Sequence, residues 1–187
     1  MYKIRSMRID AESATGAVWA SRKDPRTTFL GSILRKLHLD ELPQLFNVIR
    51  GDMSLVGPRP ERPEFVDKLD KKIDGYRHRL LVKPGITGYA QLNLPSDLDL
   101  NDVRKKLVLD FEYIEKASPV FDFLLIFGTA LKVVRLTGRL PLTWLGIYRP
   151  VDRSSWAAPL RVSQETISFQ DQSLETLFAT ETVGTKL

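Results

Sequence analysis

The 187-residue sequence contains no cysteine, which excludes disulfides and thiolate metal sites. Its two histidines, His38 and His78, are far apart in the sequence and give no support for a zinc site. No run of about 18 or more uncharged apolar residues is present, so a membrane-spanning helix is not predicted. The most apolar stretch, residues 120–136, carries Asp122, Lys132 and Arg135 and is interpreted as a buried or interfacial helix.

Positive charge is the first informative property of the sequence. The formal net charge is +5 and the isoelectric point is about 9.5. A basic balance favours nucleic acid, an anionic membrane surface or phosphorylated substrates as partners. Charge alone does not choose among these three classes.

The composition divides the chain near residue 150. Residues 150–187 are rich in Ser, Thr, Gln and Ala and contain few aromatic side chains, so little apolar surface is available to offset chain entropy. They are predicted to form a mostly flexible tail, with one short helix suggested around residues 174–178. Residues 1–149 are predicted to form the folded domain.

Hydrophobic periodicity predicts a mainly helical domain. Pro43 in a first helical turn and Gly51 just after a last turn support the first of the expected helices. Two short strands are expected at residues 80–82 and 89–92, around a Gly-containing turn. The predicted fold class is therefore α/β, predominantly helical, with a small sheet or hairpin. The expected helices cover residues 42–49, a segment after Pro63 that includes Phe65 and Ile73, residues 101–117 and residues 120–136.

Two adjacent carboxylates, Asp40 and Glu41, stand just before the helix that Pro43 is expected to start. The N-terminal end of a helix has positive potential and free N–H groups, which keep a carboxylate ionised and attract phosphate. An ionised aspartate in such a place can act as a nucleophile or as a Mg²⁺ ligand. The pair is therefore a candidate catalytic centre.

Basic residues flank this pair on both sides. Arg35 and Lys36 precede it, and Arg59 follows in a stiff Gly-Pro-Arg-Pro loop. Carboxylates, a metal ion and arginines are together the components of phosphoryl transfer. Aspartate is also a favoured helix N-cap, however, and an arginine between two prolines is more often a solvated loop residue. Residue types and spacing alone leave both interpretations open.

A series of motifs runs through the chain in a fixed order. It comprises Tyr2-Lys3-Ile4-Arg5-Ser6-Met7, Leu39-Asp40-Glu41-Leu42-Pro43-Gln44-Leu45, Asn47-Val48, Gly51-Asp52-Met53-Ser54, Gly57-Pro58-Arg59-Pro60, Lys83-Pro84-Gly85-Ile86-Thr87-Gly88 with Gln91 and Asn93, and Asp110 with Tyr113 in a Lys-x-x-x-Asp-x-x-Tyr segment. This series resembles the signature of the bacterial sugar transferase family, the monotopic phosphoglycosyl transferases. The resemblance covers residues 1–138 and implies the architecture of that catalytic domain.

The resemblance implies transfer of a sugar 1-phosphate from a UDP-sugar to a polyprenyl phosphate such as undecaprenyl phosphate. Such a reaction initiates repeat units of exopolysaccharide, capsule or O-antigen. It implies that Asp40 is the nucleophile of a covalent phosphosugar intermediate, that Glu41 is its partner, and that Mg²⁺ sits against Asp40. The implied phosphate-binding residues are Arg59, Arg35, Lys3 and Arg5, and further substrate contacts are implied at Arg79, Lys83 and Gln91.

The resemblance also implies an enzyme at the cytoplasmic face of the bacterial inner membrane, with a shallow site facing the lipid and with a homodimer as a compatible assembly. Family members carry a hydrophobic helix-break-helix before the Lys-x-Arg-Ser-Met segment, so the domain 1–149 is interpreted as N-terminally incomplete. Trp144, Tyr148 and Arg149 after the apolar stretch are typical of a bilayer interface, although a core helix with a loose extension explains the same pattern.

Two other functions are compatible with parts of the sequence. An inactive homologue could act as a scaffold at the membrane surface, and the basic cluster at residues 77–83 could bind nucleic acid. Weak aromatic interleaving and the lack of a known binding motif argue against nucleic acid. A requirement for Asp40 and Mg²⁺ would distinguish the enzyme from both alternatives. His38, beside an apolar run, is interpreted as structural rather than as a catalytic base.

Overall fold

The computed structural model describes residues 1–13, 18, 24–95, 99–133, 139–152 and 155. The expected flexible tail, residues 150–187, lies almost entirely outside these residues, as does the short helix suggested around residues 174–178. Both therefore stay predictions.

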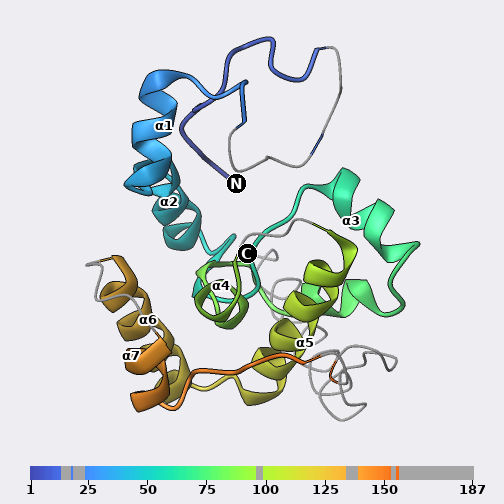
Figure 1. The fold of residues 1–187 in the computed structure, drawn as a ribbon, viewed down its shortest axis with the longest axis vertical. Coiled ribbons are helices and arrows are strands. Elements are labelled where there is room, and N and C mark those ends of the chain that lie inside the picture. Colours follow the sequence, from blue (N-terminus) through green and yellow to red (C-terminus); the bar gives the residue numbers. More distant parts are fainter. Residues whose placement is uncertain (14–17, 19–23, 96–98, 134–138, 153–154, 156–187) are drawn as a thin grey trace, which may run out of the picture.

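Helices dominate the described part of the chain, and all four expected helices form (Figure 1). The predominantly helical α/β class is thereby confirmed. In chain order the elements are α1 (Phe29–Lys36), the 3₁₀ helix η1 (Leu39–Glu41), α2 (Gln44–Ile49), β1 (Ser54–Val56), α3 (Pro63–Asp70), the 3₁₀ helix η2 (Tyr76–Leu80), β2 (Gly85–Thr87), α4 (Tyr89–Asn93), α5 (Leu100–Lys116), α6 (Pro119–Val133) and α7 (Arg139–Trp144).

The small sheet differs from the expected hairpin. Strands β1 and β2 pair in parallel, with Ser54 opposite Gly85 and Val56 opposite Thr87. The strands expected at residues 80–82 and 89–92 are wrong, because the first segment begins at the last residue of η2 and continues as a bend, and the second lies in α4. The glycine-rich segment read as a turn is itself the strand. Its glycines permit a close approach between backbones: a Cβ on Gly85 would lie 2.1 Å from the nitrogen of Gly57.

Helix α5 is the centre of the hydrophobic core. It begins after Asp99, whose carboxylate accepts a hydrogen bond of 2.8 Å from the Asp102 N–H. It packs against α4 and η2, and each large apolar side chain that it buries contributes about 1.5–3 kcal/mol. The buried apolar residues of α5 include Val103, Leu107, Leu109, Phe111 and Ile114.

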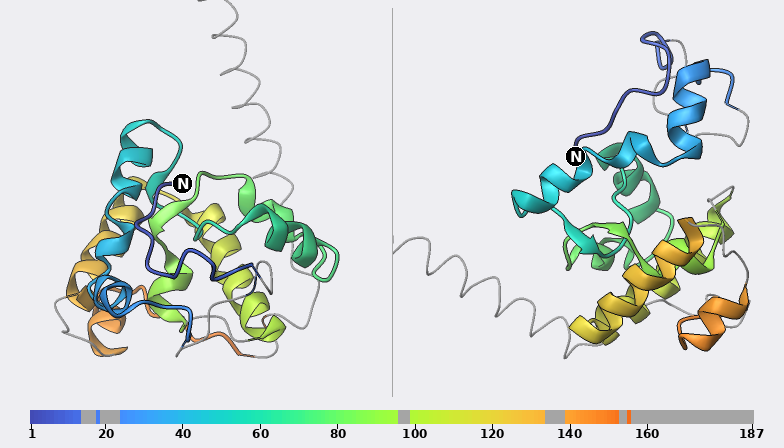
Figure 2. Two further views of the ribbon diagram at one scale, coloured as in Figure 1. Left: turned by 90° about the horizontal axis from the view of Figure 1, so that it is seen from above. Right: turned by 90° about the vertical axis from the view of Figure 1, so that its left-hand side faces the viewer.

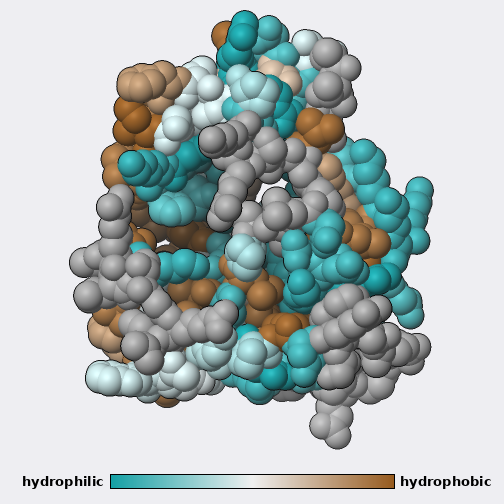
Figure 3. Space-filling model, in the orientation of Figure 1, coloured by the Kyte–Doolittle hydropathy of each residue, from teal (hydrophilic) through white to brown (hydrophobic). Residues whose placement is uncertain are grey.

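Four helices, α1, α2, α6 and α7, keep large apolar side chains in solvent, among them Trp144 of α7. In Figure 1, α1 and α2 lie at the upper left and α6 with α7 at the lower left, and the right-hand view of Figure 2 faces this side, with α1 at the top and α6 below it. Figure 3 shows brown, hydrophobic side chains along the upper left margin, over α1. None of the described helices is long and apolar enough to cross a membrane. We call the following residues the exposed apolar faces: Phe29, Leu30 and Ile33 of α1, Leu42, Leu45, Phe46 and Ile49 at α2, and Val120, Phe123, Ile126, Phe127 and Val133 of α6.

Candidate active site

Asp40 lies in η1, the short 3₁₀ helix between α1 and α2. The chain enters this turn through His38, which has a left-handed backbone with φ of 56°. The N–H of Ile4 donates a 3.0 Å hydrogen bond to the carbonyl of Asp40, so the N-terminal segment holds η1 in place. Pro43 occupies the N-cap position of α2, without a side-chain cap bond. The interpretation of Asp40 as only an N-cap of this helix is therefore wrong.

Two cations bracket the carboxylates. The Nζ of Lys3 lies 3.1 Å from Asp40 Oδ2 and 3.1 Å from Glu41 Oε1. On the other side, Arg59 Nη2 donates a 2.7 Å hydrogen bond to Glu41 Oε1. The carboxylates are nearly buried, with side chains 3% and 14% exposed, whereas those of Lys3 and Arg59 are 34% and 40% exposed. The cations can therefore meet a ligand that arrives from solvent.

The charges of the site keep Glu41 ionised. Burial by itself would raise the pKa of Glu41, but the hydrogen bond and charge of Arg59, together with Lys3, outweigh it. The pKa of Glu41 is consequently lowered. A ligand that draws either cation away would weaken this effect.

The backbone of the Gly57–Pro60 loop is fastened to its surroundings. The Gly57 N–H donates to the Thr87 carbonyl and the Gly85 N–H to the Pro58 carbonyl, each at 2.9 Å. These bonds continue the β1–β2 pairing into the loop. Arg59 is thus presented from a fixed backbone, while its side chain reaches outward to Glu41.

Arg79, one of the candidate substrate contacts, is buried. Its side chain is 2% exposed and forms an ion pair of 2.9 Å with Asp110 of α5. The neighbouring core encloses its guanidinium, and a direct contact between Arg79 and substrate stays a prediction.

In the described part of the chain, none of the ion pairs that hold the carboxylate pair involves Arg35, Arg5 or Lys83. Arg35 donates from Nε to Ser6 Oγ at 2.7 Å and from Nη1 to Thr27 Oγ1 at 3.2 Å, so it fastens α1 to the N-terminal segment. Arg5 and Lys83 are exposed. The structure therefore brings Lys3 and Arg59, but not Arg35, onto the acidic pair.

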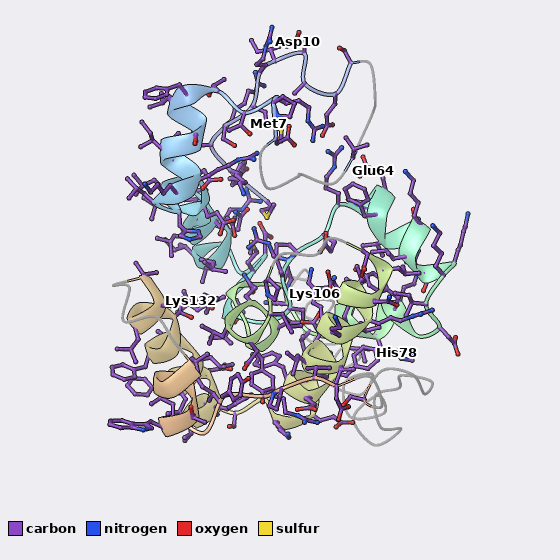
Figure 4. The ribbon with its side chains drawn as sticks, in the orientation of Figure 1. Met7, Asp10, Glu64, His78, Lys106 and Lys132 are labelled. Atoms are coloured by element: carbon purple, nitrogen blue, oxygen red, sulfur yellow. The ribbon has the colours of Figure 1, made fainter. Side chains whose placement is uncertain are left out.

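Gln91 belongs to α4, close to the β2 strand. Its side-chain amide donates a 3.0 Å hydrogen bond to the Ile86 carbonyl. The main-chain carbonyl of Gln91 accepts a 2.8 Å hydrogen bond from Nζ of Lys132, a residue of α6 (Figure 4). Burial lowers the pKa of Lys132. Gln91 thus joins α6 to the sheet, and its candidacy as a substrate contact stays a prediction.

The donor set suits a magnesium ion that is shared with a substrate. Within the described residues, no group of three or more His, Asp or Glu side chains is arranged to hold a metal alone. Magnesium is usually bound through one or two carboxylates and completes its shell with substrate phosphates and water. Asp40 with Glu41 provides such a partial set of oxygen ligands.

The sequence predicted the residues at the centre of the site but not the residues that hold them in place. Glu61 accepts a 2.6 Å hydrogen bond from Lys106 of α5, directly after the arginine loop. Asp110 belongs to one of the sequence motifs, but the sequence predicted no role for it. The structure places it against Arg79. No local pattern identifies these partners, because they come from elements far apart in the sequence.

The fold and this centre define a helical α/β domain whose carboxylate pair and flanking cations suit chemistry on phosphate esters. The particular family follows from comparison with known proteins. The chain belongs to the bacterial sugar transferase family, whose pattern matches residues 1–136.

Three sugar-phosphate transferases named for their substrates are similar to this chain. The chain is 47% identical over 129 residues to the UDP-N-acetylgalactosamine-undecaprenyl-phosphate N-acetylgalactosaminephosphotransferase of Aeromonas hydrophila, covering 69% of this chain and 30% of that protein. It is 42% identical over 136 residues to the UDP-glucose:undecaprenyl-phosphate glucose-1-phosphate transferase of Xanthomonas campestris pv. campestris, covering 72% and 28%.

An Escherichia coli (strain K12) enzyme of the same name is 42% identical over 134 residues, covering 71% of this chain and 29% of that protein. The chain thus spans less than a third of the length of these three relatives. Their names favour neither a nucleic-acid-binding domain nor a scaffold.

Proposed function

We propose that this chain transfers a sugar 1-phosphate from a UDP-sugar to undecaprenyl phosphate. The observation that carries the proposal is the Asp40–Glu41 pair, bracketed by Lys3 and Arg59 within a chain of this family. The names of the relatives support the donor and acceptor classes. In this proposal, the reaction is the first step in building a polysaccharide repeat unit.

The proposed reaction has two displacements at one phosphorus atom. An Asp40 carboxylate oxygen attacks the phosphorus nearest the sugar, the bond to the bridging oxygen breaks, and UMP leaves with that electron pair. The sugar phosphate is then held on Asp40 as an acyl phosphate. An oxygen of undecaprenyl phosphate attacks the same phosphorus and releases the carboxylate. Water and redox chemistry take no part in either step.

The flanking cations have distinct proposed tasks. Arg59 can leave Glu41 to hold diphosphate oxygens through paired N–H groups, and Lys3 acts as a point charge beside the attacking carboxylate. Glu41 lies next to the nucleophile and keeps these cations in place when no donor is bound. Mg²⁺, held by Asp40 and Glu41, would neutralise charge on the diphosphate.

The proposal is tested by following UMP release from UDP-glucose and UDP-N-acetylgalactosamine with undecaprenyl phosphate in detergent micelles. We expect release with at least one donor, dependent on both Mg²⁺ and the lipid acceptor for repeated turnover. A folded chain that releases no UMP from any UDP-sugar would contradict the proposal.

Removing Arg59 should weaken donor binding. Arg59→Ala is expected to raise the KM for the UDP-sugar about 10- to 100-fold, because a charge-assisted hydrogen bond contributes about 1.5–3 kcal/mol. Arg62→Ala is the matched control: Arg62 is three residues away, and its ion pairs to Glu12 and Glu64 lie at the surface. Steady-state kinetics should separate the two variants, and equal KM values would remove Arg59 from the donor site.

We further propose that the exposed apolar faces rest on the cytoplasmic surface of the inner membrane. Phe29 of α1 and Phe123 of α6 are 86% and 66% exposed, although such large rings are normally buried in soluble domains. An apolar face together with a basic domain suits an anionic lipid surface. Docking of this kind would bring a lipid-borne acceptor to the protein.

Vesicle sedimentation measures this docking. The chain is expected to bind phosphatidylglycerol vesicles, and Phe123→Glu should weaken binding about tenfold or more, because one buried aromatic ring contributes about 1.5–3 kcal/mol. Asn101→Glu on α5 is the control, since it adds the same charge at an exposed polar residue. An equal loss in both variants would mean that charge alone drives binding and that α6 does not enter the lipid.

A further inference from the structure

A buried arginine lies behind the loop that carries Arg59. Arg79 Nη2 donates a 2.8 Å hydrogen bond to the main-chain carbonyl of Arg59 and lies 2.9 Å from Asp110 Oδ2. Arg79 Nη1 donates to the hydroxyl of Tyr76 at 2.7 Å. Three groups from three segments therefore converge on one guanidinium.

This arrangement needs an explanation beyond stability. Burial by itself would lower the pKa of Arg79, but Asp110, Tyr76 and Glu61 together outweigh it, so the pKa is raised and the group stays protonated. Removing two charges from water costs several kcal/mol per ion, so a buried ion pair is a weak source of net stability. A planar guanidinium, however, fixes the direction of several hydrogen bonds at once. A buried guanidinium is therefore suited to fix the positions of the groups that it binds.

Through Arg59, Arg79 is linked to the carboxylate pair. The carbonyl that it holds belongs to the same residue whose guanidinium lies 2.7 Å from Glu41. Two residues further on, Glu61 is held by Lys106 Nζ at 2.6 Å, and Figure 4 shows Lys106 extending from α5 toward the centre of the molecule. Both contacts come from the core side of the loop. They leave the Arg59 side chain free to point toward the site.

We propose that Arg79, paired with Asp110, is a positioning residue that aims Arg59 at the diphosphate of the donor. This inference rests on the proposed function, because it concerns how the same site grips its substrate. Arg79 itself does not touch the substrate. Its effect on binding should pass through Arg59.

The first test replaces Arg79 by lysine and measures UDP binding by titration calorimetry in the presence of Mg²⁺. A lysine keeps the charge opposite Asp110 but cannot hold the three partners of the guanidinium fork together. We expect the Kd for UDP to rise about tenfold, since small displacements of a binding group have large effects. Arg77→Lys is the matched control: it lies in the same 3₁₀ helix, and its ion pairs with Asp67 and Asp70 are at the surface.

A double-mutant cycle separates positioning from general structural damage. In an Arg59→Ala background, Arg79→Lys should change the Kd for UDP by less than about twofold, because the group it aims is already absent. Equal losses in both backgrounds would overturn the positioning role and leave the proposed function intact. No UDP binding by the unmodified chain would overturn the proposed function as well.

A milder variant serves if Arg79→Lys does not fold. Tyr76→Phe keeps the buried ring and removes only the hydroxyl that receives the Arg79 Nη1 bond. It should raise the Kd for UDP about two- to fivefold, and this change should also vanish in the Arg59→Ala background. Unchanged UDP affinity in folded Tyr76→Phe would contradict the inference in that case.

Discussion

Asp40→Asn is expected to lower UMP release by at least about 10³-fold, because an amide cannot replace the attacking carboxylate. The side chain is 3% exposed and its Oδ2 lies 3.1 Å from Lys3, so the charge change falls at the centre of the site. The measurement is UMP release under saturating donor, with Asp67→Asn as the control. Asp67 is an exposed aspartate on α3 whose partner is the surface residue Arg77.

The same variant should remain folded. The shape of the side chain is nearly unchanged, and Lys3 keeps its second partner, Glu41. We expect a loss of about 1–2 kcal/mol in the free energy of unfolding, as is usual for one weakened polar contact. Calorimetry of the purified variant checks this. An Asp40→Asn chain with a tenth or more of the original activity would mean that another group is the nucleophile.

Gly85→Ala should strongly destabilise the fold. A Cβ at this position would lie 2.1 Å from the nitrogen of Gly57, 2.5 Å from the Thr87 carbonyl oxygen and 2.6 Å from the carbonyl carbon of Val56. All three are backbone atoms, so no side-chain rotation relieves the clash. We expect a loss of about 3 kcal/mol or more, or failure to fold.

The consequence reaches the active site through the arginine loop. The Gly85 N–H donates to the Pro58 carbonyl, next to Arg59, so separating the strands releases this loop. Gly146→Ala is the control: Gly146 has φ of 68° but open space around its Cα, and its substitution should cost only about 1 kcal/mol of backbone strain. Denaturant unfolding compares the two. A Gly85→Ala chain as stable as Gly146→Ala would contradict the close strand contact.

The helices were predictable because their signals are local. Asp99 caps α5 and the apolar spacing runs through it, so its bounds could be read from a short window. The sheet was not predictable in this way. Glycine in the segment from Gly85 suggests a turn when it is read alone, and only the approach of Gly57, from across the crossover through α3 and η2, makes an extended strand of it.

The active site likewise has features that were predictable from the sequence and features that were not. Asp40, Glu41 and Arg59 come from one continuous run of motifs, and the structure brings them together. Arg79 is indistinguishable by sequence from the exposed Arg77 two residues before it, yet it is buried because α5 supplies Asp110 as its counter-charge. Tertiary packing determines which of the two arginines is exposed, and no local sequence pattern predicts it.

In the proposed reaction, Asp40 carries the sugar phosphate during transfer. The most direct measurement is the intact mass of the chain after incubation with Mg²⁺ and a panel of UDP-sugars, without the lipid acceptor. We expect an added mass equal to one sugar phosphate, which also identifies the sugar. This mass should be absent from Asp40→Asn and should disappear from the unmodified chain when undecaprenyl phosphate is added. UMP release without an adduct at any time point, or an adduct that persists in Asp40→Asn, would contradict the proposed reaction.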